Sequence, residues 1–227
     1  MAIAFSLTVA AIVLSVAAGA RHSNVAAAEA RMQKAIARVP QHGPLLGKPS
    51  APVTVYEFAD LQCPYCGNYM RTLFPTLLAD DVVPGKVKMV LNPVWLLGDG
   101  SRWGAQAAVA AGAQNKMWNY ADAFYYNQGP ENSGYVTTGF LREVGSDVPG
   151  LNVNRLMVDT YSSATSLRFK AMLAFARAQG VVATPTFIVL RADGRSEVVV
   201  GSAKLEAAID RALKHSGRKS AAGQNVE

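Results

Sequence analysis

The only two cysteines of the chain stand three positions apart, in the motif Cys63-Pro64-Tyr65-Cys66. They follow a β-branched and aromatic run, Val53 to Phe58, and precede apolar residues at helical spacing, which places the motif between a strand and a helix. A helix start carries partial positive charge and free N–H groups, and both favour a thiolate over a thiol. Cys63 would then attack, and Cys66, buried one turn further on, would resolve a mixed disulfide. The spacing therefore predicts reversible dithiol–disulfide chemistry, and Pro64 suits a helix start because its missing N–H costs nothing there.

Two other interpretations of the cysteine pair stay open: half of a zinc site, and a pair without reactivity. A structural zinc ion needs about four ligands, and the chain has no further cysteine. Its three histidines lie in the flanks of the predicted domain or near its end, at His22, His42 and His215. We therefore expect neither a metal ion nor a cofactor. Two cysteines also cannot build the framework of a disulfide-stapled secreted domain.

Two further residues could take part in chemistry at the cysteines. Pro185 begins the apolar strand PTFIVL, where a proline argues for a special backbone, such as a cis bond beside a site. An ordinary proline at a strand start is the alternative. Glu57 lies within the strand VTVYEF, where a buried carboxylate is costly without a partner or a role, such as exchanging a proton with Cys66. A side chain that faces solvent is the alternative.

The elements that must position these residues alternate between strand and helix patterns. The expected strands lie at 53–58, 86–94, 185–190 and 197–200, with a two-residue turn, Asp193-Gly194, between the last two. A helix over 66–78 should kink at Pro75. Further helical segments are expected within 102–126, 137–144, 153–161 and 166–179, and a final helix with Ser202 as its N-cap. This order predicts an α/β fold in which a helical insertion, 100–180, separates parts at 51–99 and 181–215.

The two ends of the chain differ from this central region. Residues 1–20 are apolar and uncharged, so we interpret 1–30 as a signal peptide or a membrane anchor, with a buried core helix as the third interpretation. No basic residue precedes the apolar run and Arg21 follows it, which by the positive-inside bias alone would keep the body of the protein in the cytoplasm. Residues 31–50 are expected to form a linker, with a short helical segment, AEARMQKAIARV, leading into residues rich in proline and glycine, and residues 216–227 are expected to form a disordered tail.

Composition supports a folded protein and gives no sign of nucleic-acid binding. Hydrophobic residues make up 50% and charged residues 17% of the 227 positions. The net charge of +6 is spread over the flanks, without a run of five like charges or aromatics interleaved with basic residues. We expect five aromatic residues to pack in the helical core, or to edge a peptide groove: Trp103, Trp118, Phe124, Tyr125 and Phe169.

Three stretches resemble the DsbA-like branch of the thioredoxin superfamily, in its Gram-positive and actinobacterial secreted or anchored form. They are GKPSAPVTVYEFADLQCPYCGNY, SRWGAQAAVAAGAQNKMWNYADAFYYNQGPENSGY and GVVATPTFIV, and the resemblance runs from about Gly47 to Leu213. A CxxC motif alone is moderately specific. The order of CxxC, a helical insertion and TPTF is much more specific.

The resemblance implies a thioredoxin-like fold interrupted by a helical domain. It implies that Cys63 attacks, that Cys66 resolves, and that Pro185 is a cis-proline facing them, with Thr184 before it. Pro64, Tyr65, Thr184 and Pro185 would contact substrate, and Glu57 matches the buried acidic residue of the family. There are two departures: Ala183 stands where glycine is common, and Tyr65 replaces the histidine of strongly oxidising members, which should make Cys63 less acidic and the disulfide a milder oxidant.

The leading hypothesis for function is an oxidase that introduces disulfides into exported proteins. Its partners would be unfolded or folding exported proteins with free cysteines, and a membrane redox partner that is DsbB-like or vitamin K epoxide reductase-like. The location would be extracytoplasmic, in the periplasm or cell envelope, with residues 2–20 as the anchor if they are not removed. A disulfide isomerase or reductase of the same fold, and a peptide-binding chaperone without redox turnover, are the alternatives.

Overall fold

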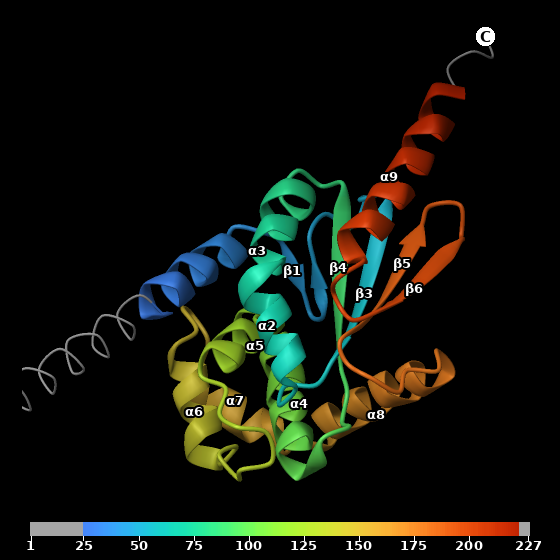
Figure 1. The fold of residues 1–227 in the computed structure, drawn as a ribbon. Helices are drawn as coiled ribbons and strands as arrows, with labels where there is room; N and C mark the ends of the chain where they lie inside the picture. The colour runs from blue at the N-terminus through green and yellow to red at the C-terminus, as the bar shows by residue number, and fades with distance from the viewer. Residues whose placement is uncertain (1–24, 223–227) are drawn as a thin grey trace, which may run out of the picture.

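A six-stranded mixed sheet forms the centre of the protein (Figure 1). The structure is a computed structural model that describes residues 25–222. Strand order across the sheet is β1-β2-β4-β3-β5-β6, with β3 parallel to β4 and every other neighbouring pair antiparallel. The bounds of the strands are β1 Gln41–His42, β2 Leu45–Leu46, β3 Val53–Ala59, β4 Val87–Pro93, β5 Thr186–Arg191 and β6 Ser196–Val200.

The central strands β3 and β4 follow from their residue types. Each strand has two valines, and β3 adds a threonine and two aromatic residues; such side chains suit the pleated, half-buried surface of a sheet. Val53, Val55, Val87 and Met89 are fully buried, and they alternate with partly exposed neighbours. The last three residues of each strand are buried on both faces, so the chain leaves the carboxyl end of β3 already inside the protein.

Five helices form the predicted insertion, and they lie beyond the end of the sheet from which the connection between β3 and α2 emerges (Figure 1). They are α4 Gly98–Gly112, α5 Met117–Tyr126, α6 Thr138–Ser146, α7 Val153–Thr160 and α8 Ser163–Ala178. Side chains of Thr137, Asn152 and Ser162 cap the last three at their N-termini. Four of the five predicted core aromatics are buried, whereas Trp103 is 37% exposed, so its assignment to the core was wrong.

The helix after the cysteines breaks where the sequence predicts a kink. Helix α2 covers Pro64–Thr72, α3 covers Phe74–Leu77, and one π-helical turn, η1, covers Leu78–Val82. Pro75 lies in the first turn of α3, where it has no N–H to donate back to the preceding turn. The break at Leu73 is therefore the physical consequence of this proline.

The segment predicted as a linker, 31–50, is part of the folded domain. Residues 25–37 form a helix, which we call the N-terminal helix, and β1 and β2 then extend the sheet beside β4. Met32 and Ile36 on this helix are buried, as is Leu46 in β2. The Gln33 amide donates hydrogen bonds to the Asn119 carbonyl and to Asp122, both at 2.8 Å, and so ties the helix to α5. The density of proline and glycine indicated a linker, but the apolar residues at helical spacing before them form a helix that packs onto the domain.

Two smaller expectations near the C-terminus also need correction. Gly194, at φ +85°, ends a three-residue loop between β5 and β6, since the Arg191 N–H donates to the Arg195 carbonyl, so the turn is longer than the two-residue form. Helix α9 spans Leu205–Ala222 and begins after the predicted cap Ser202. It also continues past residue 216, where the sequence analysis placed a disordered tail.

The predicted signal peptide or anchor lies almost wholly outside the described residues, which begin at 25. Between residues 25 and 222, no helix combines the length and the apolar character needed to span a membrane.

Candidate active site

Cys63 is the N-cap residue of α2, and its backbone is extended, with φ −69° and ψ 120°. Pro64 occupies the first turn, as the sequence predicts. The pKa of Cys63 is lowered to about 6. The largest cause is the hydrogen bond from the Cys66 thiol to the Cys63 sulfur, and burial acts in the opposite direction. The N–H groups of Tyr65 and Cys66 act in the same direction, because a free helix N-terminus stabilises negative charge. Cys63 is thus poised to be a thiolate at neutral pH.

Cys66 has the opposite character. Its side chain is fully buried, and burial is the main reason why its pKa is raised well above the usual value for a thiol. Negative charge on Cys63 or Glu57 would raise it further. Both cysteines are in the free, reduced form. The motif therefore holds one thiol with a lowered pKa, Cys63, and one more deeply buried thiol with a raised pKa, Cys66.

Glu57 lies beneath the pair on β3, and it is fully buried, so its predicted burial is confirmed. Burial raises the pKa of this carboxyl to about 8, and the Tyr69 hydroxyl lowers it only in part. Neither carboxyl oxygen has a partner within ordinary hydrogen-bond geometry in the described part of the chain. Tyr125 is also fully buried. Its pKa is raised first by burial and then by charge on Cys66 and Glu57, so it belongs to the same buried group. Glu57 is therefore a neutral acid at pH 7, electrostatically coupled to Cys66.

Thr184, which is 121 positions after Cys63, and Pro185 complete the site. They directly precede β5, the strand that pairs with β3. The peptide bond between Thr184 and Pro185 is cis. The Cys63 sulfur lies 3.4 Å from the Thr184 carbonyl oxygen, to which its thiol form donates a hydrogen bond. The Gly201 N–H donates to the Pro185 carbonyl at 2.8 Å, and the Thr186 hydroxyl donates to the Ala183 carbonyl at 2.8 Å. The structure thus brings together Cys63, Thr184 and Pro185, as the resemblance implies.

Asp60, which sequence reasoning missed, holds the loop between β3 and α2. One of its carboxylate oxygens accepts the Gln62 N–H at 2.9 Å, and the other accepts the N–H groups of Leu96 and Leu97 at 2.9 and 3.1 Å. The Asp60 carbonyl accepts the Cys63 N–H at 3.0 Å. An aspartate at the end of an apolar strand, three residues before the first cysteine, was the available signal.

Residues at the ends of the helices of the insertion reach the same loop and fix its backbone. The Gln128 amide donates to the carbonyls of Leu61 and Cys63, at 2.9 and 3.1 Å. The Gln62 amide donates to the Leu97 carbonyl at 2.6 Å and to the Ser101 hydroxyl at 3.1 Å. No sequence pattern could have predicted these bonds, because they depend on how the insertion packs onto the loop. The insertion therefore contributes directly to the geometry of the cysteine motif.

The surface beside the cysteines is apolar and open. Tyr65, between the cysteines, is 74% exposed, and Val182, two residues before Thr184, is 87% exposed. Exposed apolar side chains on both sides of a reactive thiol suit contact with a polypeptide substrate. Across the described residues, no cluster of three histidine, cysteine, aspartate or glutamate side chains could hold a metal ion.

The comparisons with known proteins agree with this geometry. A family model described as "Thioredoxin" matches residues 40–211. The "Probable disulfide bond formation protein D" of Bacillus cereus is 32% identical over 120 residues, which cover 52% of this chain and 56% of that protein. The "Disulfide bond formation protein D" of Bacillus subtilis is 27% identical over 148 residues, covering 64% of this chain and 67% of that protein.

A solved structure shows the same arrangement over a longer span. The crystal structure of oxidised BdbD from Bacillus subtilis superposes with a TM-score of 0.68 at 25% sequence identity, and the match covers 78% of this chain and 97% of that one. The family match, over residues 40–211, includes all six strands, the CxxC motif and the five helices of the insertion. The chain therefore belongs to the thioredoxin family, as a DsbA-like member of that superfamily.

Proposed function

We propose that this protein is a thiol–disulfide oxidoreductase that acts as an oxidase and introduces disulfides into exported proteins. The observation that carries the proposal is the difference between its two thiols: the pKa of Cys63 is lowered to about 6, whereas that of Cys66 is raised well above its usual value. A stabilised Cys63 thiolate favours the reduced form of the pair, so the oxidised pair readily gives its disulfide away. The names of the matching Bacillus proteins support the same activity.

The first step is attack on the oxidised pair. A substrate thiolate attacks the Cys63 sulfur, a bond forms between substrate and Cys63, and the Cys63–Cys66 bond breaks. Cys63 is 4% exposed and lies next to exposed Tyr65, whereas Cys66 has no exposed surface, so Cys63 is the sulfur of the two that a substrate can reach. Cys66 leaves with the electron pair and needs a proton, because its burial disfavours a thiolate.

Glu57 is the residue that supplies this proton. Burial raises its pKa to about 8, so the carboxyl is protonated at neutral pH and can act as an acid toward Cys66, directly or through one water molecule. A second substrate thiolate then attacks the substrate sulfur of the mixed disulfide, and Cys63 leaves as a thiolate. The substrate has lost two electrons and gained a disulfide, and the enzyme pair has gained the two electrons.

Thr184 and Pro185 would hold the substrate backbone beside Cys63, with Pro64 and Tyr65 on the other side. The 3.4 Å separation of the Cys63 sulfur and the Thr184 carbonyl supports this placement. Exposed Val182 extends the same apolar surface. For further turnover, a membrane redox partner would reoxidise the pair, and the location would be extracytoplasmic.

The test is disulfide transfer to a reduced, unfolded protein with two cysteines, measured with the oxidised full-length protein. Stoichiometric transfer with concomitant reduction of Cys63 and Cys66 is expected. The Cys63→Ser variant is the control, because a chaperone without redox turnover would keep its activity and an oxidase would lose it. An equilibrium with glutathione that places the reduction potential near about −270 mV, on the thioredoxin scale, would show a reductase and contradict the proposal.

A further inference from the structure

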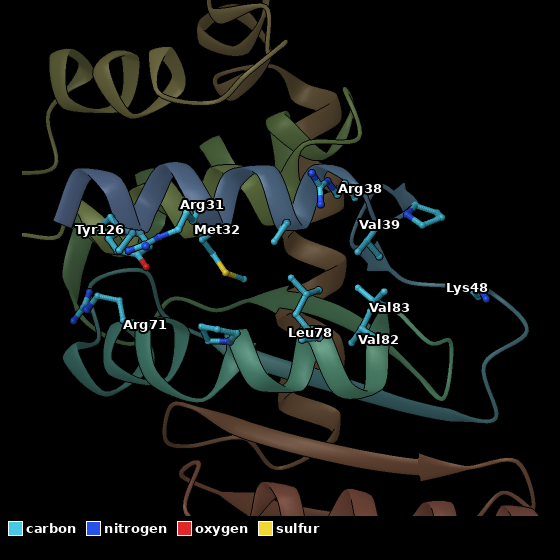
Figure 2. Close-up of a pocket in the computed structure, with 15 residues that line it drawn as sticks. Arg31, Met32, Arg38, Val39, Lys48, Arg71, Leu78, Val82, Val83 and Tyr126 are labelled. Carbon is cyan, nitrogen blue, oxygen red and sulfur yellow. The ribbon is translucent and has the colours of Figure 1, made fainter. Parts of the chain in front are cut away.

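A second cavity lies away from the redox pair, between the N-terminal helix on one side and α3 with η1 on the other (Figure 2). Its volume is about 670 Å³, within the range of small-molecule sites. Nothing in the dithiol chemistry uses it. The floor is made by apolar side chains of both helical segments, among them Met32, Ala35, Leu78 and Val82.

Four cationic side chains surround this apolar floor, and no acidic side chain of residues 25–222 lines it. Arg31 and Arg71 lie with Tyr126 at one end of the cavity, and Arg38 and Lys48 lie at the other end (Figure 2). None of the four forms an ion pair with any residue in the described part of the chain. The cavity therefore offers an apolar interior with unneutralised positive charge at both ends.

The spacing along the N-terminal helix explains this arrangement. Ala28, Arg31, Met32 and Ala35 occupy positions i, i+3, i+4 and i+7, so they share one face of the helix, and Val39 follows just beyond its end. The opposite contact, through Gln33 to α5, fixes the helix and keeps this face open. Arg31 lies on the helix, and Arg38 follows directly after its last residue, so the two cations are separated by nearly two helical turns. The cavity is therefore elongated, with a cationic group near each end.

We propose that this cavity binds a free fatty acid: a single acyl chain with a carboxylate head. The head would lie between Arg31 and Arg71, because a guanidinium group matches a carboxylate with two parallel hydrogen bonds. Arg71 already donates one hydrogen bond to the Tyr125 carbonyl, which holds its guanidinium in place and leaves other N–H groups for the ligand. The acyl chain would run over Met32 and Leu78 toward Arg38.

The lining of the cavity disfavours a peptide as its occupant. Between the two charged ends, Met32, Ala35, Leu78 and Val82 carry no group that forms ordinary hydrogen bonds, and the surrounding backbone groups are engaged within helices. A peptide would bring buried N–H and C=O groups without partners, and each would lower the affinity. An acyl chain has no such groups. The volume also suits one chain better than the two chains of a phospholipid.

The experiment measures binding of dodecanoate to the full-length protein by isothermal titration, below the concentration at which micelles form. We expect a single site with a dissociation constant below about 100 µM, and a strengthening of about fourfold for each CH₂ added from octanoate until the cavity is filled. Dodecylamine and a neutral dodecyl glycoside should bind at least about tenfold more weakly, because they have no carboxylate to pair with the guanidinium groups of Arg31 and Arg71.

Two variants separate this site from nonspecific binding. Arg31→Glu should weaken dodecanoate at least about tenfold, whereas Lys170→Glu, an equal change of charge at an exposed position of α8, should not. Ala79→Trp, at an exposed edge of the cavity, should block binding by filling it, while Ala207→Trp on exposed α9 should not. Circular dichroism melting confirms that each variant is folded.

Several results would overturn the proposal. They are a dissociation constant above about 1 mM, equal binding of the amine and the carboxylate, or dodecanoate binding that survives Ala79→Trp in a folded protein. Binding to vesicles that contain phosphatidylglycerol, without binding of dodecanoate, would show a membrane-surface site instead. Displacement of dodecanoate by an acidic peptide at lower concentration would show a peptide site. None of these outcomes depends on disulfide transfer, so they are independent of the proposed oxidase activity.

Discussion

The two ends of the α2–α3 stretch differ in how the chain builds them. At the start of α2, Asp60 and Gln128 satisfy the backbone groups of the loop that carries Cys63, and Thr184, just before the neighbouring strand β5, contacts the Cys63 sulfur. Towards the other end, around the break at Leu73, the chain leaves an apolar gap whose cations, such as Arg31, form no ion pair among the described residues. The first end is organised for a reaction at one sulfur atom, and the second for holding an anionic apolar molecule.

The largest effect expected from any single change separates the two ends. Cys63→Ser should abolish disulfide transfer, because the attacking sulfur is gone and buried Cys66 cannot be reached. Dodecanoate binding should stay the same, since neither cysteine lines the cavity. Disulfide transfer and calorimetric titration on the same preparation measure both. If the substitution weakened dodecanoate binding, the two ends would not be independent.

Removal of the buried acid should slow the reaction next most strongly. Glu57→Gln keeps the shape of the side chain but removes the proton, so reduction of the oxidised pair by a small dithiol should slow by about a hundredfold at pH 7. In the unmodified protein the rate attributable to this proton should fall as the pH rises through about 8, the pKa of Glu57, and the variant should lack that fall. If Glu57 had only a structural role, the variant would be slower by the same factor at every pH, and its rate would still fall as the pH rises through about 8.

Loss of the loop support should affect stability. Asp60→Ala leaves the N–H groups of Leu96 and Leu97 without their acceptor, so the free energy of unfolding should fall by about 1–3 kcal/mol. Asp99→Ala is the matched control, since Asp99 belongs to an exposed ion pair with Arg102 and should cost less than about 1 kcal/mol. Urea denaturation of both variants measures the difference. Equal losses would mean that Asp60 does not hold the loop.

The smallest effect concerns the residue between the cysteines. Tyr65→His places an imidazole beside the Cys63 sulfur, and an imidazolium there should stabilise the thiolate and lower its pKa below about 6. The pair should then become a few-fold stronger oxidant in equilibrium with glutathione. Tyr65→Gln is the control, because it removes the ring without adding a charge. No difference between the two variants would show that the imidazole is not close enough to matter.

Most of the redox site could be predicted from the sequence, because local rules specify it. Cys63, Pro64 and Cys66 lie at a strand-to-helix junction that periodicity alone reveals. The cis bond before Pro185 and the burial of Glu57 were open alternatives at that stage, and the structure decides both. Asp60 was missed because its partners, Leu96 and Leu97, lie 36 and 37 residues away.

The segment that packs against the other end of the α2–α3 stretch, residues 31–50, was wrongly predicted to be a linker, for a physical reason. Proline and glycine between 40 and 49 indicated a linker, but Gly43 and Pro44 form the turn of the hairpin of β1 and β2, and Pro40 and Gly47 flank it, with the Gly47 N–H donating to the Pro40 carbonyl. Docking of the N-terminal helix depends on long-range bonds from Gln33 to α5, which have no signature in the local sequence. A cavity between two helices becomes visible only after both have been placed.

The most direct test of the account is a titration of the Cys63 thiolate by its ultraviolet absorbance in the reduced protein. The pKa should lie near about 6, with Cys66 remaining protonated well above the usual value. Relative to the oxidised protein, the reduced protein should gain stability as the pH rises from about 6, because the lowered pKa of Cys63 favours the folded thiolate, and lose that gain as the pH falls back through the same value. A Cys63 that titrates near about 8.5, like a free thiol, with no pH dependence of this stability difference between pH 6 and 8, would contradict the account.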